Sequence, residues 1–211
     1  MKKKTINITR SPHPLKYVDK IFKIIVIGDK SVGKTSLISR AVTGEFKDYL
    51  DTTICPDISA IFYKYKELRF KLQLWDTCEL EQYQTLNKVF YHGADVVLLL
   101  YSPDNVDTVN SSKKWLEAIR ANCKPNIKIY LVGTKHDLNK TNNASEEFKN
   151  FVESNEIQGN FEVSSKTGFG IEEMLNQIFK HEVASYEENT YHERRSRLSS
   201  GSFEPRSSCP C

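Results

Sequence analysis

The sequence lacks any long hydrophobic run. Its longest apolar stretch, from Ala94 to Tyr101, is interrupted by Asp95, whereas a helix that spans a bilayer needs about 20 mainly apolar residues. No apolar stretch follows the lysines near the amino end, and residue 2 is lysine where N-myristoylation requires glycine. We therefore expect no membrane-spanning segment, no secretory signal and no myristoyl group, and we expect a cytoplasmic protein.

Cysteine is sparse and irregularly placed, with five in 211 residues. Three of them, Cys55, Cys78 and Cys123, fit neither a disulfide framework nor a zinc motif. We therefore expect reduced thiols in the body of the chain. The other two, Cys209 and Cys211, stand at its end and need a separate interpretation.

The sequence also lacks a large excess of one charge, since its formal net charge is +3. Residues 1–20 hold six basic side chains and one acidic one, residues 185–211 are balanced, and the region between them is slightly acidic. A binder of nucleic acid normally carries a basic surplus on its folded body. We therefore expect no nucleic-acid partner, and only the basic arm of residues 1–20 suits an acidic membrane surface.

The length of the chain suits one α/β domain with flexible ends. Residues 1–20 are polar and predict a flexible basic arm, so structure should begin near Ile21. Short apolar runs of strand type then alternate with helix-like stretches. The strand-type runs are Phe22–Ile27, Lys71–Trp75, Val96–Tyr101, Ile127–Val132 and Phe161–Val163. The helices should begin near Gly33, Glu81, Ser111, Ser145 and Gly170.

One further segment predicts an antiparallel hairpin. Residues 57–65 and residues 68–75 have strand character and are joined by Lys66-Glu67. Strands that alternate with helices, with one hairpin, predict an α/β fold with a mainly parallel six-stranded sheet and helices on both faces. Ligands bind such sheets at the carboxyl ends of the strands. Apolar periodicity ends after Ser185, which predicts a folded domain over residues 21–184 and a disordered tail over residues 185–211.

A phosphate-binding motif directly follows the first predicted strand. Residues 28–35 fit G-x-x-x-x-G-K-[ST] and lead into an apolar-periodic helix, a chance match in an ordinary strand–turn–helix being the alternative. The glycines let successive backbone N–H groups point at phosphate, and the helix N-terminus adds its positive dipole. Lys34 supplies charge to the β- and γ-phosphates, and Thr35 supplies a magnesium ligand. The predicted contact residues are Gly28, Asp29, Lys30, Ser31, Val32, Gly33, Lys34, Thr35 and Ser36.

The phosphate motif fits both ATP and GTP. Two further segments indicate which base is bound. Residues 132–137 and residues 163–166 each follow a predicted strand and resemble the N-K-x-D and S-A-K boxes of small GTPases. Asp137 would accept from the N1–H and 2-amino groups of guanine, and such a site rejects the wrong base by roughly 10⁴ or more. The resemblance implies base contacts by Lys135, Ser164, Ser165 and Lys166. Thr134 stands where the family usually has asparagine, and we expect this change to weaken the tie to the phosphate loop.

The resemblance spans about residues 22–183 and is most specific to the Rab branch of the small GTPases. Lys71–Thr77 is Rab-like, and Phe90–Ala94 lies where Rab proteins have a Y-Y-R-G-A type box. The resemblance implies that residues 21–184 form the small G domain of a P-loop NTPase. An ATP-using P-loop kinase or ATPase remains an alternative that leaves Thr134–Asp137 without a role.

The same resemblance assigns cofactors and further site residues. It implies binding of GTP or GDP with Mg²⁺, held by Thr35, Thr53 and Asp76. Thr53 would close over the magnesium ion and the γ-phosphate. Phe46 falls where the family stacks an aromatic ring on guanine, although the pattern alone equally fits a buried core phenylalanine.

The predicted partner surface departs from the Rab pattern. The usual I-G-V-D-F segment is here Ile54-Cys-Pro-Asp-Ile58. Of the aromatic triad that Rab proteins present, Trp75 is kept, Phe90 is a conservative change and Ile58 replaces phenylalanine. We expect effector and exchange-factor proteins to bind through these switch regions, but not necessarily those that other Rab proteins bind.

The segment that should position the attacking water departs further. It reads D-T-C-E-L-E where the family has D-T-A-G-Q-E, so Leu80 replaces the water-orienting glutamine and has neither donor nor acceptor. Glu79 replaces a glycine whose N–H meets the γ-phosphate. Lys30 stands where a side chain crowds that phosphate and any arginine finger, the alternative being that its ammonium group substitutes for such a finger. Lys34 and Thr53 keep their catalytic positions, so we expect a GTPase with severely slowed hydrolysis. Two alternatives remain open: tolerant switch loops with ordinary cycling, and a GTP-locked module that recruits effectors to a membrane.

The end of the chain suggests a lipid anchor. Cys209-Pro210-Cys211 resembles the C-x-C signal on which prenylation machinery places two geranylgeranyl groups in Rab proteins, whereas a C-a-a-X box would need cysteine at Ser208. Two lipid chains anchor stably where one is marginal. We therefore expect a peripheral protein on the cytoplasmic face of an endomembrane or the plasma membrane, acting in vesicle and membrane traffic. A pair of unmodified thiols is the alternative.

Overall fold

The computed structural model describes residues 8–11, 13–48, 57–77, 90–138 and 157–199. Its strands are β1 (Ile8–Ser11), β2 (Lys20–Ile27), β3 (Asp57–Tyr65), β4 (Leu68–Asp76), β5 (Val96–Tyr101), β6 (Lys128–Gly133) and β7 (Gly159–Glu162). Its helices are α1 (Lys34–Thr43), α3 (Val106–Asn122), the short 3₁₀ helix η2 (His136–Leu138) and α5 (Ile171–Ser199). The chain divides into two units, Met1–Met174 and Leu175–Cys211, with the boundary inside α5.

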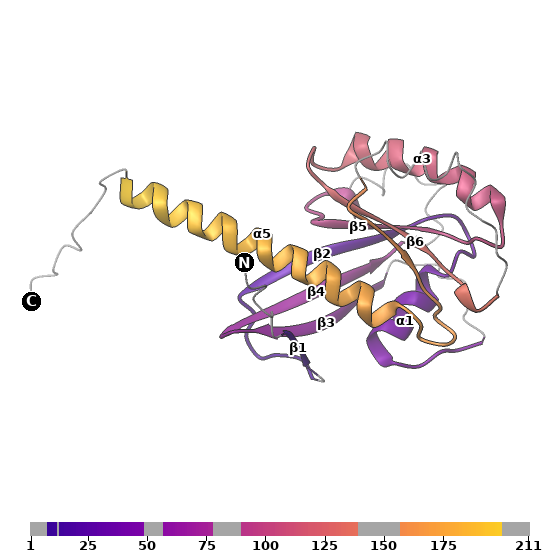
Figure 1. Cartoon of the computed structure of the whole chain (residues 1–211), viewed down its shortest axis with the longest axis horizontal. Coiled ribbons are helices and arrows are strands. Elements are labelled where there is room, and N and C mark those ends of the chain that lie inside the picture. Colours follow the sequence, from indigo (N-terminus) through magenta and orange to yellow (C-terminus); the bar gives the residue numbers. More distant parts are fainter. Residues whose placement is uncertain (1–7, 12, 49–56, 78–89, 139–156, 200–211) are drawn as a thin grey trace, which may run out of the picture. The chain divides into compact units, whose positions relative to one another are not determined.

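The described strands form one seven-stranded sheet in the order β1-β3-β4-β2-β5-β6-β7 (Figure 1). The pairs from β4 through β2, β5 and β6 to β7 are parallel, whereas β3 is antiparallel to both β1 and β4. The predicted α/β fold with a mainly parallel sheet and the β3–β4 hairpin is therefore confirmed. The prediction of six strands was wrong by one, because β1 adds a strand to the edge of β3.

Strand β1 lies inside the segment that the sequence predicted to be a flexible arm. Its four residues form no long apolar run, so periodicity did not indicate a strand there. It pairs with Phe62–Tyr65 of β3 through the main chain. Its Arg10 donates to the carbonyls of Ala41 and Val42 at the end of α1 and pairs with Glu172 at 2.9 Å. A cation at a helix C-terminus is favourable, so these long-range contacts stabilise a strand that local sequence does not specify.

The β3–β4 hairpin has the turn that the sequence predicts. Lys66 adopts a φ of 54°, the left-handed conformation that two-residue hairpin turns require. Along β4, the side chains of Phe70, Leu72 and Leu74 are buried, and those between them are more exposed. Since side chains alternate across a strand, one face of the hairpin belongs to the core and the other lies nearer to solvent.

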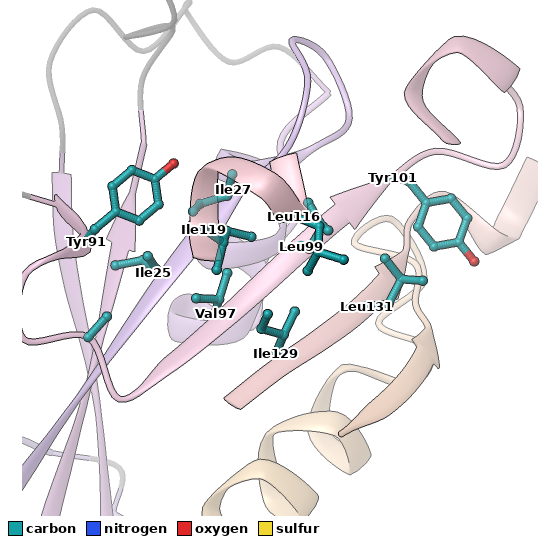
Figure 2. Close-up of a cluster of buried hydrophobic side chains, with 11 residues drawn as sticks. Ile25, Ile27, Tyr91, Val97, Leu99, Tyr101, Leu116, Ile119, Ile129 and Leu131 are labelled. Atoms are coloured by element: carbon teal, nitrogen blue, oxygen red, sulfur yellow. The ribbon is translucent and has the colours of Figure 1, made fainter. Parts of the chain in front are cut away.

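A second part of the core lies between α3 and the opposite face of the central strands. Figure 2 shows buried side chains from four elements gathered there: Ile25 and Ile27 of β2, Val97 and Leu99 of β5, Ile129 and Leu131 of β6, and Leu116 and Ile119 of α3. Residues two apart on each strand share this face, and residues three apart on the helix cover it. Each fully buried aliphatic side chain contributes about 1.5–3 kcal/mol. This packing fixes the carboxyl ends of β2, β5 and β6, where the candidate site residues begin.

Helix α3 begins earlier than the sequence predicts. The sequence placed its start near Ser111, but Asn105 caps the helix by accepting a hydrogen bond from the N–H of Asp107. An asparagine at this position satisfies an N–H group that would otherwise lack a partner. The predicted helix starts near Glu81 and Ser145 lie outside the described residues.

Helix α5 begins at Ile171, next to the predicted start, and continues to Ser199. The sequence predicted no helix after Ser185 because apolar periodicity ends there. Glutamate, arginine and leucine favour helix, and a helix that has formed extends more readily than a new one nucleates. The extension therefore needs no apolar face of its own. Among the described helices, none combines the length and apolar character that crossing a bilayer requires.

Candidate nucleotide-binding site

The loop between β2 and α1 has a backbone path that glycine makes possible. Gly28 has a φ of 149° and Gly33 a φ of 97°. A Cβ atom at Gly28 would lie 2.3 Å from the carbonyl oxygen of Leu100, so a side chain cannot fit there. Gly33 caps α1 without a side-chain hydrogen bond. No side chain therefore competes with a phosphate group for the first N–H groups of this helix.

Lys34 is held across this loop. Its Nζ atom donates to the carbonyl oxygens of Gly28 at 2.7 Å and of Asp29 at 2.9 Å. These bonds fix the position of the ammonium group at the start of α1. The loop therefore carries a point charge where the sequence motif requires one for phosphate.

Asp76 ends β4 beside the same loop and is only 2% exposed. Burial raises the pKa of Asp76, while a hydrogen bond with Thr35 and the charge of Lys34 oppose the shift. Its buried Oδ1 atom has no hydrogen-bond partner among the described residues. A nearby cation would favour the charged carboxylate and satisfy this oxygen.

The oxygen atoms of Thr35 and Asp76 fit a magnesium ion. Magnesium prefers oxygen ligands and usually takes one or two carboxylates, the rest being waters and substrate phosphates. No cluster of three or more His, Cys, Asp or Glu occurs in the part of the chain that the structure describes. A magnesium ion shared with phosphate needs no such cluster, so the donor set is sufficient.

Thr134 has a tie to the phosphate loop, and the expectation that it is weaker than that of asparagine stays a prediction. Its hydroxyl group donates to the carbonyl of Val32 at 2.7 Å and lies 3.1 Å from the carbonyl of Tyr101. The Tyr101 carbonyl also accepts from the N–H of Thr134 at 2.9 Å. A hydroxyl has one proton where an asparagine amide has two. The single hydroxyl proton is donated to the carbonyl of Val32, and the carbonyl of Tyr101 already accepts from the main-chain N–H.

We expect Thr134→Val to speed the release of bound nucleotide about tenfold, because one buried hydrogen bond to the loop is worth about 1–1.5 kcal/mol. Valine keeps the shape of threonine but leaves the Val32 carbonyl without this donor. The release of a fluorescent nucleotide after addition of excess unlabelled nucleotide measures the effect. Thr134→Ser is the control, since it retains the hydroxyl and should release at nearly the wild-type rate. Equal rates for the valine and wild-type proteins would contradict the assigned tie.

The two predicted base-binding loops meet at the ends of β6 and β7. The Ser164 hydroxyl donates to Asp137 Oδ1 at 2.5 Å, and the N–H of Thr167 donates to Ser164 Oγ at 3.1 Å. The N–H of His136 donates to the carbonyl of Val163 at 3.1 Å. Because Ser164 accepts from the main chain, its own proton is directed to Asp137. The Asp137 carboxylate is therefore held in a fixed orientation.

The other predicted base-site residues lie on the same loops. Lys135 has a φ of 56°, and its Nζ atom lies 3.7 Å from Asp104 Oδ2. Asp104 also accepts from the hydroxyl of Ser102, so the end of β5 contributes to holding this lysine. Ser165 is buried and Lys166 is exposed. Sequence reasoning missed Asp104, because no local motif links it to Lys135.

Trp115 is a second residue that sequence reasoning missed. Its indole Nε1 donates to Asp29 Oδ1 at 2.7 Å, joining α3 to the phosphate loop. The only signal in the sequence is a tryptophan on an amphipathic helix, which predicts packing rather than a hydrogen bond. The bond restrains the carboxylate of a residue whose carbonyl oxygen holds Lys34.

For some predicted site residues the structure gives only how exposed they are, so their contacts stay predictions. Phe46 is half-buried after α1, and Ser36 is half-buried within that helix. Lys30 and Ser31 are exposed at the tip of the phosphate loop. The predicted residues Thr53, Glu79, Leu80, Cys209 and Cys211 lie outside the described residues.

The three predicted partner-contact residues come together beside the site. Ile58 of β3 is directly opposite Trp75 of β4 and is 48% exposed. The rings of Trp75 and Phe90 meet edge to face with centroids 5.8 Å apart. Lys23 Nζ lies 3.9 Å from the centre of the Trp75 ring and donates to the carbonyl of His92 at 2.8 Å. Cation–π contact thus fixes the tryptophan from the neighbouring strand.

These features define a P-loop nucleotide-binding protein: the phosphate loop after β2, the carboxylate ending β4 and the paired loops after β6 and β7 all stand at carboxyl ends of parallel strands. Comparison with known proteins narrows this class. The sequence model that describes the Ras family matches residues 23–184 of this chain. The chain belongs to the Ras family and is a small GTPase of the Rab type. Members of this family are GTPases that bind guanine nucleotides.

Three relatives have names of the Rab type. The Ras-related protein Rab7 of Pisum sativum is 31% identical over 199 residues, which cover 90% of this chain and 97% of the relative. The Ras-related protein Rab-5A of Dictyostelium discoideum is 32% identical over 160 residues, covering 75% of this chain and 79% of the relative. The Ras-related protein Rab-34 of Rattus norvegicus is 33% identical over 162 residues, covering 75% of this chain and 62% of the relative.

Proposed function

We propose that this protein is a guanine-nucleotide switch that acts in vesicle and membrane traffic. One observation carries the proposal: two groups are held in fixed positions at the carboxyl ends of the parallel strands. They are the ammonium group of Lys34, which suits phosphate, and the carboxylate of Asp137, which suits the base. A carboxylate accepts from the paired N–H donors of guanine, and adenine does not present that pair. GTP would order the switch segments around Thr53 and Asp76, and its loss would release them.

Magnesium completes the proposed cofactor set. Thr35 and Asp76 would hold the ion, with Thr53 as the third residue. When bound, the ion neutralises charge on the β- and γ-phosphates. The residues themselves do the rest: Lys34 and the loop N–H groups hold the phosphate, and the buried position of Asp76 keeps its carboxylate beside Thr35.

The proposed partners follow from the surface beside the site. Ile58 is exposed opposite the half-buried Trp75, whose ring packs on the buried Phe90, and this apolar group suits contact with effector and exchange-factor proteins. Prenylation machinery would act on Cys209 and Cys211, and the product would be a peripheral protein on the cytoplasmic face of a membrane. The slightly acidic body supports no nucleic-acid partner.

The lipid anchor is tested on protein made in a eukaryotic host. We expect mass spectrometry of the C-terminal peptide to find a geranylgeranyl group on both Cys209 and Cys211, and cell fractionation to find the protein with membranes. The matched variants are Cys209→Ser and Cys211→Ser. Each single variant should shift to the soluble fraction, because one chain gives only marginal, reversible binding. Unmodified thiols on membrane-fractionated wild-type protein would rule the anchor out.

A second candidate function is favoured by the sequence at Glu79 and Leu80. Leu80 has no donor or acceptor with which to orient the attacking water, and Glu79 replaces a glycine and brings a negative charge near an anion. We infer a protein that hydrolyses GTP very slowly. In the extreme form it would be a GTP-locked module that recruits effectors and depends on exchange or membrane delivery for control.

A further inference from the structure

The end of the sheet away from the nucleotide site carries a concentration of basic side chains. Residues 16–23 and 62–71 together hold seven lysines and arginines but only Asp19 and Glu67 as acids. These two segments include the start of β2, the β3–β4 turn and the start of β4, which lie at the same end of the sheet (Figure 1). Strand β2 has eight residues and leads to Gly28, so this end is about 25 Å from the phosphate loop.

Strand pairing puts several of these side chains on one face. Lys64 lies directly opposite Arg69, and Phe62 lies opposite Lys71 in the β3–β4 hairpin. Ile21 of β2 pairs with Lys71 of β4. Paired residues, and residues two apart on a strand, share a face of a sheet. The basic sheet face is therefore made of Ile21, Phe62, Lys64, Arg69 and Lys71.

This face is accessible and is extended by the chain before β2. Lys64 and Arg69 are exposed, Lys71 and Phe62 are half-buried, and Ile21 is 44% exposed. The N–H of Asp19 donates to the Arg69 carbonyl at 2.8 Å, and Asp19 Oδ2 accepts from the Arg69 N–H at 2.7 Å.

These two hydrogen bonds hold Asp19 beside Arg69, and Lys16 and Tyr17 precede Asp19 by three and two residues. Lys20 pairs with Phe70 of β4 and therefore lies on the other face of the sheet. Tyr17 is 66% exposed, and Lys16 is exposed as well.

The cross-strand pair Lys64–Arg69 is itself unfavourable. Like charges directly opposite each other on neighbouring strands destabilise a sheet. An anionic partner would relieve this repulsion, whereas water and salt only screen it. The pair therefore points to an anion as the natural neighbour of this face.

We propose that the basic sheet face docks on an anionic membrane surface. The cations come from separate strands and spread over a sheet, with the side chains of Ile21 and Phe62 on the same face. A planar surface of acidic headgroups can meet all of them at once. This contact goes beyond the nucleotide switch and is independent of the lipid anchor.

The test uses full-length protein carrying Cys209→Ser and Cys211→Ser, so that lipidation makes no contribution. We expect it to co-sediment with phosphatidylcholine vesicles that contain phosphatidylserine, more weakly as salt rises, and not with phosphatidylcholine alone. Each lysine or arginine near an anionic surface changes partitioning about fivefold. Adding Lys64→Gln, Arg69→Gln and Lys71→Gln should therefore weaken binding about 10²-fold.

A matched variant separates this face from overall charge. Lys113→Gln, Lys114→Gln and Lys180→Gln remove the same charge from exposed helix positions and should weaken binding less than about fivefold. Bound nucleotide and thermal unfolding check the fold, and the face variant should be no less stable, because it removes the Lys64–Arg69 repulsion.

Three results would overturn the proposal. The first is equal binding by the two glutamine variants, and the second is equal binding to the two kinds of vesicle. The third is face-dependent binding of a polyglutamate peptide without vesicle binding, which would assign the face to an acidic protein. Each of these results leaves the nucleotide switch and the lipid anchor untouched.

Discussion

Replacing Asp137 with asparagine is expected to weaken binding of guanosine diphosphate by roughly 10²–10⁴-fold, because two hydrogen bonds to a charged group are each worth about 1.5–3 kcal/mol. The structure also predicts which base gains. The Ser164 hydroxyl accepts from Thr167 N–H and donates to Asp137 Oδ1, so an asparagine here would turn its oxygen towards Ser164 and its amino group towards the base. Xanthine has a carbonyl where guanine has the 2-amino group, so xanthosine diphosphate should bind the variant more tightly than guanosine diphosphate.

Competition of guanosine diphosphate and xanthosine diphosphate against a fluorescent nucleotide measures this change in base preference. The control is Asp137→Asn combined with Ser164→Ala, which removes the hydroxyl that orients the amide. The doubly substituted protein should lose most of its preference for xanthine, because the amide can then present either its oxygen or its amino group. An Asp137→Asn protein that keeps the wild-type order of affinities would show that Asp137 does not read the base.

Hydrolysis is the second large expected effect. Ordinary intrinsic rates of small GTPases are roughly 10⁻⁴ s⁻¹, and we expect the wild-type protein to be at least about tenfold slower, so that GTP lasts many hours. Leu80→Gln alone should restore little, because the Glu79 side chain still restricts the loop and brings negative charge towards phosphate. Glu79→Gly together with Leu80→Gln should restore an ordinary rate.

Single-turnover assays on protein loaded with GTP measure the hydrolysis rate of each variant directly. Cys78→Ala is the matched control, since it changes a neighbouring position to the usual family residue without supplying a water-positioning group; its rate should stay at the wild-type level. A wild-type rate equal to that of ordinary small GTPases, with or without an activating protein, would return the chain to the class of cycling enzymes.

The sequence was sufficient where local pattern and structure coincide. The β3–β4 turn at Lys66-Glu67 has its predicted bounds because it separates two continuous runs of strand-forming residues. The strand Val96–Tyr101 has its predicted bounds because it is itself such a run. The glycines of the phosphate loop were predictable for a related reason. A motif that needs positive φ at Gly33 and no Cβ at Gly28 permits few other residues, so the requirement is visible in the sequence.

The sequence was insufficient where distant contacts decide. β1 depends on pairing with β3 and on the contacts of Arg10 with the end of α1, and neither is encoded near residue 10. The bond from Trp115 to Asp29 joins residues that are 86 apart. The tie from Thr134 to Val32 likewise joins residues that are 102 apart, and no local pattern shows it.

The central claim is that the chain binds guanine nucleotide through Asp137 and the phosphate loop, and the most direct measurement is of the nucleotide that purified native protein carries. Chromatography of the released nucleotide should find GDP or GTP, and GTP with magnesium should raise the unfolding temperature of stripped protein, whereas ATP with magnesium should not. Release of ATP or of no nucleotide, together with no thermal shift on adding GTP and magnesium, would contradict the account.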